Sequence, residues 1–232
     1  IDDFQGLVCA KFSQDNLGAT KAAVLYDVAS EYNKGIAEVY KKSFEEAGGE
    51  IVAFETYTTG DKDFSSQLTK IVGTNPDVVF LPNYYSEVPL QVQQAQRIGY
   101  TGDFLGSDGW GSAELITLGG ASMEGQYFST HYAPDIVSPE AQKFIEAYKT
   151  KYKSVPDDVA ALTYDSFNLL CQSIQAAGKL DREAVRNALA GVEEFKGVTG
   201  QMQFKGSGDP IKSAVIIQIS DGQFKYFDTV NP

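Results

Sequence analysis

The chain has 232 residues, of which 43% are hydrophobic, and a formal net charge of −12 with a pI near 4.5. This length and apolar content predict one large or two small folded domains with a substantial core, and they argue against disorder. The acidic charge argues against a nucleic-acid partner, because phosphate binding requires a basic surface. No uninterrupted apolar stretch of the sequence approaches the roughly 20 residues that span a bilayer.

The first 130 residues predict an alternation of helices and β-strands. After an opening helix, five β-type runs are separated by helical patterns, at 22–26, 51–57, 78–81, 104–105 and 126–129. Strands separated by helices imply a parallel sheet. The predicted fold class is therefore α/β, with a doubly wound parallel sheet.

The pattern changes after Pro134. Two long helices are predicted over 138–152 and 157–177, and a third helix follows Asp181. Three helices without a sheet of their own lack a partner layer for their apolar faces. Either they pack on the first sheet, or the sheet to which they belong is not part of this chain.

Small polar and aromatic clusters directly follow four of the predicted strands. They occupy 27–32, 58–61, 83–87 and 107–110. Parallel α/β sheets bind ligands at the carboxyl ends of their strands, so these clusters point to one edge of the sheet. The clusters contain tyrosines and a carboxylate but no evident catalytic set. The sequence therefore predicts a site that holds a small molecule and does not convert it.

Other chemistry finds little support in the sequence. His131 is the only histidine, and Cys9 and Cys171 form no closely spaced pair, so we expect no metal site and no cofactor. The segment 106–109 lacks the lysine and the glycine spacing of a phosphate-binding loop. We do not expect this protein to be an enzyme.

Seven short segments occur in an order that resembles the type I periplasmic (extracellular) solute-binding proteins, in particular the leucine/isoleucine/valine-binding branch. They are DFQG (3–6), YDVASEYNKG (26–35), TGDKDF (59–64), NPD (75–77), YYSE (84–87), GSDG (106–109) and LTYD (162–165). Each segment is weak alone, but together they cover essentially the whole chain.

This resemblance implies two α/β lobes. Residues 1–130 and 213–232 would form the second lobe, which binds the ligand ammonium, and residues 131–212 would form the helical part of an incomplete first lobe. The opening units of the first lobe, with their sheet, have no counterpart in the sequence. We therefore expect a C-terminal fragment or a natural truncation.

The resemblance also implies the ligand-binding residues. In leucine-type members the amino acid lies in the cleft between lobes, and its ammonium pairs with an acid that falls on Asp108 here. Tyr32 and Tyr84 align with tyrosines that flank the ligand. Trp110, the only tryptophan, is a further candidate, either as a pocket wall or as a cover for the domain edge. The structural alternatives are a turn at Asp108 and tyrosines half-packed on their own lobe.

The implied function is the substrate-binding component of an ABC importer, which captures a branched-chain or other hydrophobic amino acid between two lobes and delivers it to a membrane permease. Such a protein is periplasmic or extracellular, with a lipid anchor as one form in a Gram-positive organism. The incomplete lobe predicts impaired binding, and its exposed helices predict a homo-oligomer. The alternative is a ligand-sensing receptor domain of the same fold that signals through a protein partner.

Overall fold

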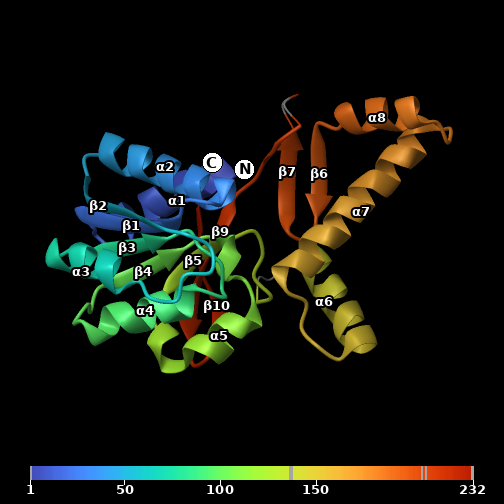
Figure 1. The fold of residues 1–232 in the computed structure, drawn as a ribbon. Helices are drawn as coiled ribbons and strands as arrows, with labels where there is room; N and C mark the ends of the chain where they lie inside the picture. The colour runs from blue at the N-terminus through green and yellow to red at the C-terminus, as the bar shows by residue number, and fades with distance from the viewer. Residues whose placement is uncertain (1, 136–137, 205, 207, 231–232) are drawn as a thin grey trace. The chain divides into compact units, whose positions relative to one another are not determined.

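The structure is a computed structural model that describes residues 2–135, 138–204, 206 and 208–230, with side chains from Phe4 onward (Figure 1). The chain divides into two compact units. The larger unit contains residues 2–130 and 216–230, and the smaller unit contains residues 131–215. Among the described residues, none of the helices combines the length and the apolarity needed to cross a membrane.

A seven-stranded sheet forms the centre of the larger unit, in the order β10-β9-β5-β4-β3-β1-β2. Neighbouring strands from β2 to β5 pair in parallel, which confirms the predicted doubly wound sheet. β9 and β10 are joined by a tight turn with positive φ at Asp221 (55°) and Gly222 (65°), as a two-residue hairpin requires. The strands are β1 (Lys21–Asp27), β2 (Glu50–Tyr57), β3 (Val78–Leu81), β4 (Asp103–Gly106), β5 (Tyr127–Thr130), β9 (Ala214–Ser220) and β10 (Gln223–Val230).

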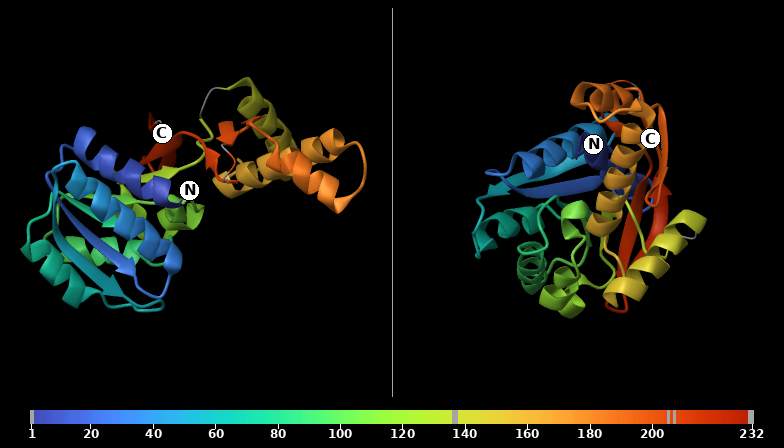
Figure 2. Two further views of the ribbon diagram at one scale, coloured as in Figure 1. Left: turned by 90° about the horizontal axis from the view of Figure 1, so that it is seen from above. Right: turned by 90° about the vertical axis from the view of Figure 1, so that its right-hand side faces the viewer.

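Helices cover both faces of this sheet (Figure 1, Figure 2). On one face, α1 (Asp2–Asp15) and α2 (Glu31–Glu46) pack closely together, since a Cβ at Gly6 would lie 2.8 Å from the Ile36 carbonyl oxygen. The opposite face carries α3 (Ser65–Gly73), α4 (Val88–Arg97) and α5 (Ala113–Gly119). All four residues of β3 are buried, as expected for a central strand covered on both sides.

The winding direction of the sheet reverses between β1 and β3. The chain runs outward from β1 to β2 and then returns past β1 to continue with β3, β4 and β5. In doubly wound sheets, ligands bind at the carboxyl ends of the strands next to such a reversal. The topology therefore directs attention to the loops that follow β1 and β3.

The smaller unit contains the three predicted helices, α6 (Pro139–Tyr152), α7 (Asp158–Ala177) and α8 (Arg182–Ala190). It also contains a sheet that the sequence did not predict. This sheet is antiparallel and consists of β6 (Glu194–Gly197), β7 (Gly200–Phe204) and β8 (Pro210–Ile211). Its strands are short, and only Phe195 and Gly197 of β6 are buried, so their alternation is too brief to be recognised. The segment is therefore not purely helical.

Candidate functional site

Asn83 ties together the loops at the carboxyl ends of β1 and β3. Its buried side-chain oxygen accepts hydrogen bonds from the backbone of Asp27 (3.3 Å) and the side chain of Asn33 (3.1 Å). Its nitrogen donates to the carbonyl of Leu25 (2.9 Å) and the side chain of Gln91 (3.0 Å). Since buried polar groups are costly when unpaired, these four bonds hold the edge in one conformation.

Two acidic side chains at this edge are engaged by donors from the protein. Asp27 accepts from the backbone nitrogens of Ala29 (2.9 Å) and Thr59 (3.1 Å) and from the Thr59 hydroxyl. Glu87 accepts from the hydroxyl of Tyr57 at 2.6 Å. These contacts hold the loop after β2 against the rest of the edge. Asp27 and Glu87 therefore position loops, and neither is our candidate for a ligand contact.

Tyr32, Tyr84 and Asp108 come together at the same edge. The Tyr32 hydroxyl hydrogen-bonds with the Asp108 carboxylate, lies 2.9 Å from the Ser107 hydroxyl, and accepts from the backbone nitrogen of Gly109 at 3.3 Å. The rings of Tyr32 and Tyr84 stack, with centroids 5.5 Å apart and planes inclined by 25°. The three residues predicted from separate loops thus form one cluster, which we call the tyrosine–aspartate cluster.

Burial and the nearby charge of Asp108 both raise the pKa of Tyr32 above its ordinary value. The phenol therefore stays protonated at neutral pH and can donate to the carboxylate. Tyr32 and Asp108 are half-buried, whereas Tyr84 is 44% exposed. The cluster thus offers aromatic surface and one carboxylate at an accessible edge, which suits a cation that carries an apolar group.

Gln5 positions Asp108, although its role was not predicted. Its buried side-chain oxygen accepts from the backbone nitrogen of Asp108 at 3.0 Å and from the Ser129 hydroxyl at 3.2 Å. Gln5 and Asp108 are separated by 103 positions along the chain, so no local pattern indicates their contact. The amide links α1 to the loop after β4 and fixes the start of the short 3₁₀ helix η1 (Asp108–Trp110).

Trp110 lies behind the cluster and is fully buried. Its indole nitrogen donates to the carbonyl of Leu81 at 3.0 Å, and its ring packs against Gly106 and Phe128. Of the two roles considered for Trp110, this environment supports packing, because no part of the indole is open to a solute in the structure. Its contact with Gly106 supports the turn that presents Asp108.

Metal chemistry finds no support in the described residues, where no group of three or more His, Cys, Asp or Glu side chains could hold an ion. The two cysteines are free, with Cys9 buried and Cys171 partly buried. Burial raises the pKa of the Cys9 thiol to about 12, which keeps it protonated and unreactive at neutral pH.

The doubly wound sheet, with acidic and aromatic side chains beside its winding reversal, defines a fold that binds a small molecule at a strand edge. A sequence profile of the family described as periplasmic binding protein matches residues 5–223. The chain belongs to this family. The named relatives below are solute-binding proteins and not enzymes.

Individual relatives bind branched-chain amino acids by name. The leucine-, isoleucine-, valine-, threonine-, and alanine-binding protein of Pseudomonas aeruginosa is 30% identical over 209 residues, which cover 90% of this chain and 55% of that protein. The Leu/Ile/Val-binding protein homolog 2 of Brucella abortus is 29% identical over 231 residues, covering 97% of this chain and 61% of that protein. The chain thus spans little more than half the length of these curated relatives.

Solved structures show the same likeness over the whole chain. The leucine-binding protein LivK of Thermotoga maritima is 37% identical, with a TM-score of 0.95 over 100% of this chain and 66% of that chain. LivJ of Streptococcus pneumoniae, the substrate-binding protein of a branched-chain amino acid transporter, was solved with isoleucine. It is 33% identical, with a TM-score of 0.90 over 100% of this chain and 66% of that chain.

Proposed function

We propose that this chain belongs to the substrate-binding component of an ABC importer and holds the ammonium end of a branched-chain or other hydrophobic amino acid. The observation that carries the proposal is the tyrosine–aspartate cluster at the winding reversal of the sheet. The names of the relatives supply the solute class and the transport context. The importer's partner would be a membrane permease, and the protein would act in the periplasm or outside the cell.

The chemistry of the cluster suits an amino acid in three respects. A carboxylate binds an ammonium through charge-assisted hydrogen bonds, which are shorter and stronger than neutral ones. The hydroxyl of Tyr32 orients the Asp108 carboxylate and leaves acceptor capacity for a second donor. The exposed ring of Tyr84 offers an apolar face to the aliphatic side chain of the solute.

We further propose that the 232-residue chain alone binds its solute weakly. It corresponds to 66% of the two solved relatives, so residues in the remaining part of those proteins have no equivalent here. An affinity that depends on contacts from both parts falls steeply when one part is missing, because each 1.4 kcal/mol lost weakens binding tenfold. A sensing receptor domain that signals through a protein partner is the alternative, and the names of the relatives favour transport.

The proposed function can be tested by NMR titration of the chain with leucine. We expect amide shifts confined to the loops that carry Tyr32, Tyr84 and Asp108, with a Kd above about 0.1 mM. The substitution Asp108→Asn should weaken the interaction at least tenfold, because it removes the charge that pairs with the ammonium. The substitution Glu114→Gln, on an exposed helix of the same unit, is the matched control and should change nothing.

A deaminated analogue of leucine separates ammonium recognition from hydrophobic binding. 4-Methylpentanoate keeps the side chain and the carboxylate, so it should produce no shift at Asp108. If the analogue and leucine gave equal shifts, or if leucine shifted no signal of the cluster, the proposed role of these residues would be wrong.

Calorimetry tests the weakness of binding separately. Leucine, isoleucine, valine and phenylalanine should each give no detectable heat with the chain at about 50 µM, since the expected Kd exceeds that concentration. LivK of Thermotoga maritima, described as a leucine-binding protein, is the positive control for leucine. A submicromolar Kd for the 232-residue chain would refute the idea that binding is impaired.

A further inference from the structure

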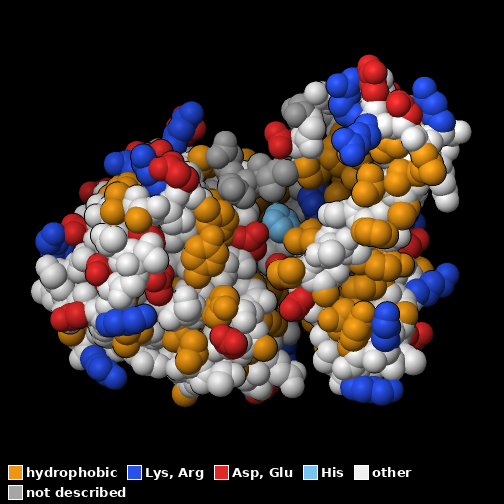
Figure 3. All heavy atoms as spheres, turned by 45° about the vertical axis from the view of Figure 1, so that its right-hand side comes forward, with side chains coloured by type: hydrophobic (Ala, Val, Ile, Leu, Met, Phe, Trp, Pro, Cys, Tyr) orange, Lys and Arg blue, Asp and Glu red, His pale blue; other side chains and the backbone are white. Residues whose placement is uncertain are grey.

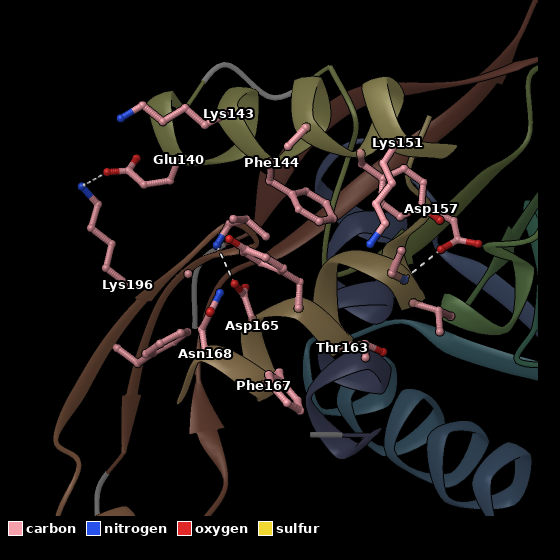
Figure 4. A pocket seen from close by; sticks show the side chains of 18 of the residues that line it. Glu140, Lys143, Phe144, Lys151, Asp157, Thr163, Asp165, Phe167, Asn168 and Lys196 are labelled. Carbon is pink, nitrogen blue, oxygen red and sulfur yellow. Dashed lines mark hydrogen bonds and ion pairs between the residues drawn. The ribbon is translucent and has the colours of Figure 1, made fainter. Parts of the chain in front are cut away.

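The smaller unit contains a large groove that the proposed amino-acid site does not use. Its volume is about 1010 Å³, and it lies among α6, the first half of α7, and β6 (Figure 4). Its lining is rich in aromatic rings: Phe144, Tyr148, Tyr152, Tyr164, Phe167 and Phe195. Phe144 points from α6 toward α7, with its ring centroid 4.8 Å from that of Tyr164.

Several of the apolar side chains in this groove are unusually exposed. Val159 and Phe167 are each 67% exposed, Tyr152 is 55% exposed and Tyr164 is 45% exposed. Hydrophobic side chains gather in a band on this unit (Figure 3). Single exposed hydrophobic residues are ordinary, but a contiguous apolar groove with a polar rim marks an interaction surface.

The charges that line the groove balance one another. Three lysines (Lys143, Lys151 and Lys196) accompany three carboxylates (Glu140, Asp157 and Asp165), whereas the whole chain carries a net charge of −12. Two copies of so acidic a chain repel each other over most of their surface. A locally neutral groove is a place where that repulsion is weak and where neither a strongly acidic nor a strongly basic partner is preferred.

Each end of the groove carries both signs of charge (Figure 4). Lys196 pairs with Glu140 at 2.8 Å at one end, and Lys151 and Asp157 lie at the other. A two-fold interface brings the same patch of two subunits together, so it requires a surface that complements itself. An apolar centre with opposite charges at both ends meets that requirement.

We propose that this groove is the contact surface between two copies of this chain. The two-fold axis passes near Phe167, so that each copy places exposed side chains of α7 in the groove of the other. Burial of these apolar side chains drives the association, and the charges at the ends set the orientation.

Sedimentation equilibrium of the purified chain tests the proposal. We expect a monomer–dimer equilibrium with a Kd near or below about 10 µM. Phe167→Glu and, independently, Val159→Glu should each weaken dimerisation at least tenfold, because each places a charge in the apolar contact. Leu118→Glu is the matched control, since Leu118 is 53% exposed on the larger unit, and it should leave the equilibrium unchanged.

Circular dichroism confirms that each variant is folded before its association is measured. A chain that stays monomeric at about 0.5 mM would overturn the proposal, and so would Leu118→Glu acting as strongly as the groove variants. The leucine titration is independent of this result, because the tyrosine–aspartate cluster belongs to the larger unit. Phe167→Glu should leave the shifts at Asp108 unchanged.

Discussion

Replacing Gly106 by alanine should destabilise the larger unit by about 3 kcal/mol. A Cβ at this position would overlap the indole of Trp110, and the ring cannot move aside freely because its nitrogen donates to the Leu81 carbonyl. Gly106 also ends the fully buried part of β4 and precedes Ser107 and Asp108. The strain should therefore reach the loop that carries the proposed ammonium-binding acid.

Urea denaturation followed by tryptophan fluorescence measures this effect, since Trp110 is the only tryptophan. The matched control is Gly35→Ala in α2, where an added Cβ meets no atom within 4 Å. That change should stabilise the protein by up to about 1 kcal/mol, because alanine favours the helix and restricts the unfolded chain. Equal effects of the two substitutions would show that Trp110 does not constrain position 106.

If the strain reaches Asp108, Gly106→Ala should also blue- or red-shift the fluorescence of the folded state and weaken leucine binding. The control variant should do neither. A variant that is destabilised but has unchanged leucine shifts would separate the packing of Trp110 from the presentation of Asp108. The tyrosine–aspartate cluster would then be held by Gln5 and Asn83 alone.

The parallel sheet was predictable because its strands are continuous apolar runs. β3 is buried along its whole length, and only the first residue of β1 is exposed, so each reads as a strand covered on both faces. The convergence of Tyr32, Tyr84 and Asp108 was also predictable. Each follows a strand of the same parallel sheet, and the carboxyl ends of such strands share one edge.

The side chains that fix this edge were not predictable. Asn83, Asp27 and Gln5 act through partners that are distant in sequence, and each is an ordinary polar residue in its own loop or helix. The same holds for Asp165 in α7, which accepts from the backbone of Val198 (2.7 Å) and Thr199 (2.9 Å) in the unpredicted sheet. Such contacts depend on tertiary structure, which periodicity does not encode.

Lys212 forms a further contact of this kind. Its ammonium donates to the carbonyl of His131 at 3.2 Å and to the hydroxyl of Thr199 at 2.8 Å. The contact joins the segment after β5 to the segment before β9, both within the smaller unit. Burial lowers the pKa of Lys212 from 10.5 to about 8, against the opposing effect of the Asp165 charge.

This lowered pKa predicts that Lys212 makes the folded state more stable as pH rises from about 8 to 10.5. Below pH 8 the amine is charged in both states, and the folded state bears the cost of burying the charge. Between the two pKa values the unfolded chain binds more protons than the folded chain, so the free energy of unfolding rises with pH. Above the unfolded value both forms are neutral and the cost has disappeared.

The measurement compares the wild-type chain with Lys212→Met by urea denaturation at about pH 7 and about pH 9.5. The comparison cancels the opposite effect of buried groups such as Cys9, whose raised pKa makes the folded state less stable at high pH. The wild-type chain should gain about 2 kcal/mol relative to the variant over this interval. Lys179→Met, at an exposed position, should show no such change. A difference between wild type and Lys212→Met that does not vary with pH would mean that the Lys212 amine is as well solvated in the folded state as in the unfolded chain, and that its contacts with His131 and Thr199 are made at no electrostatic cost.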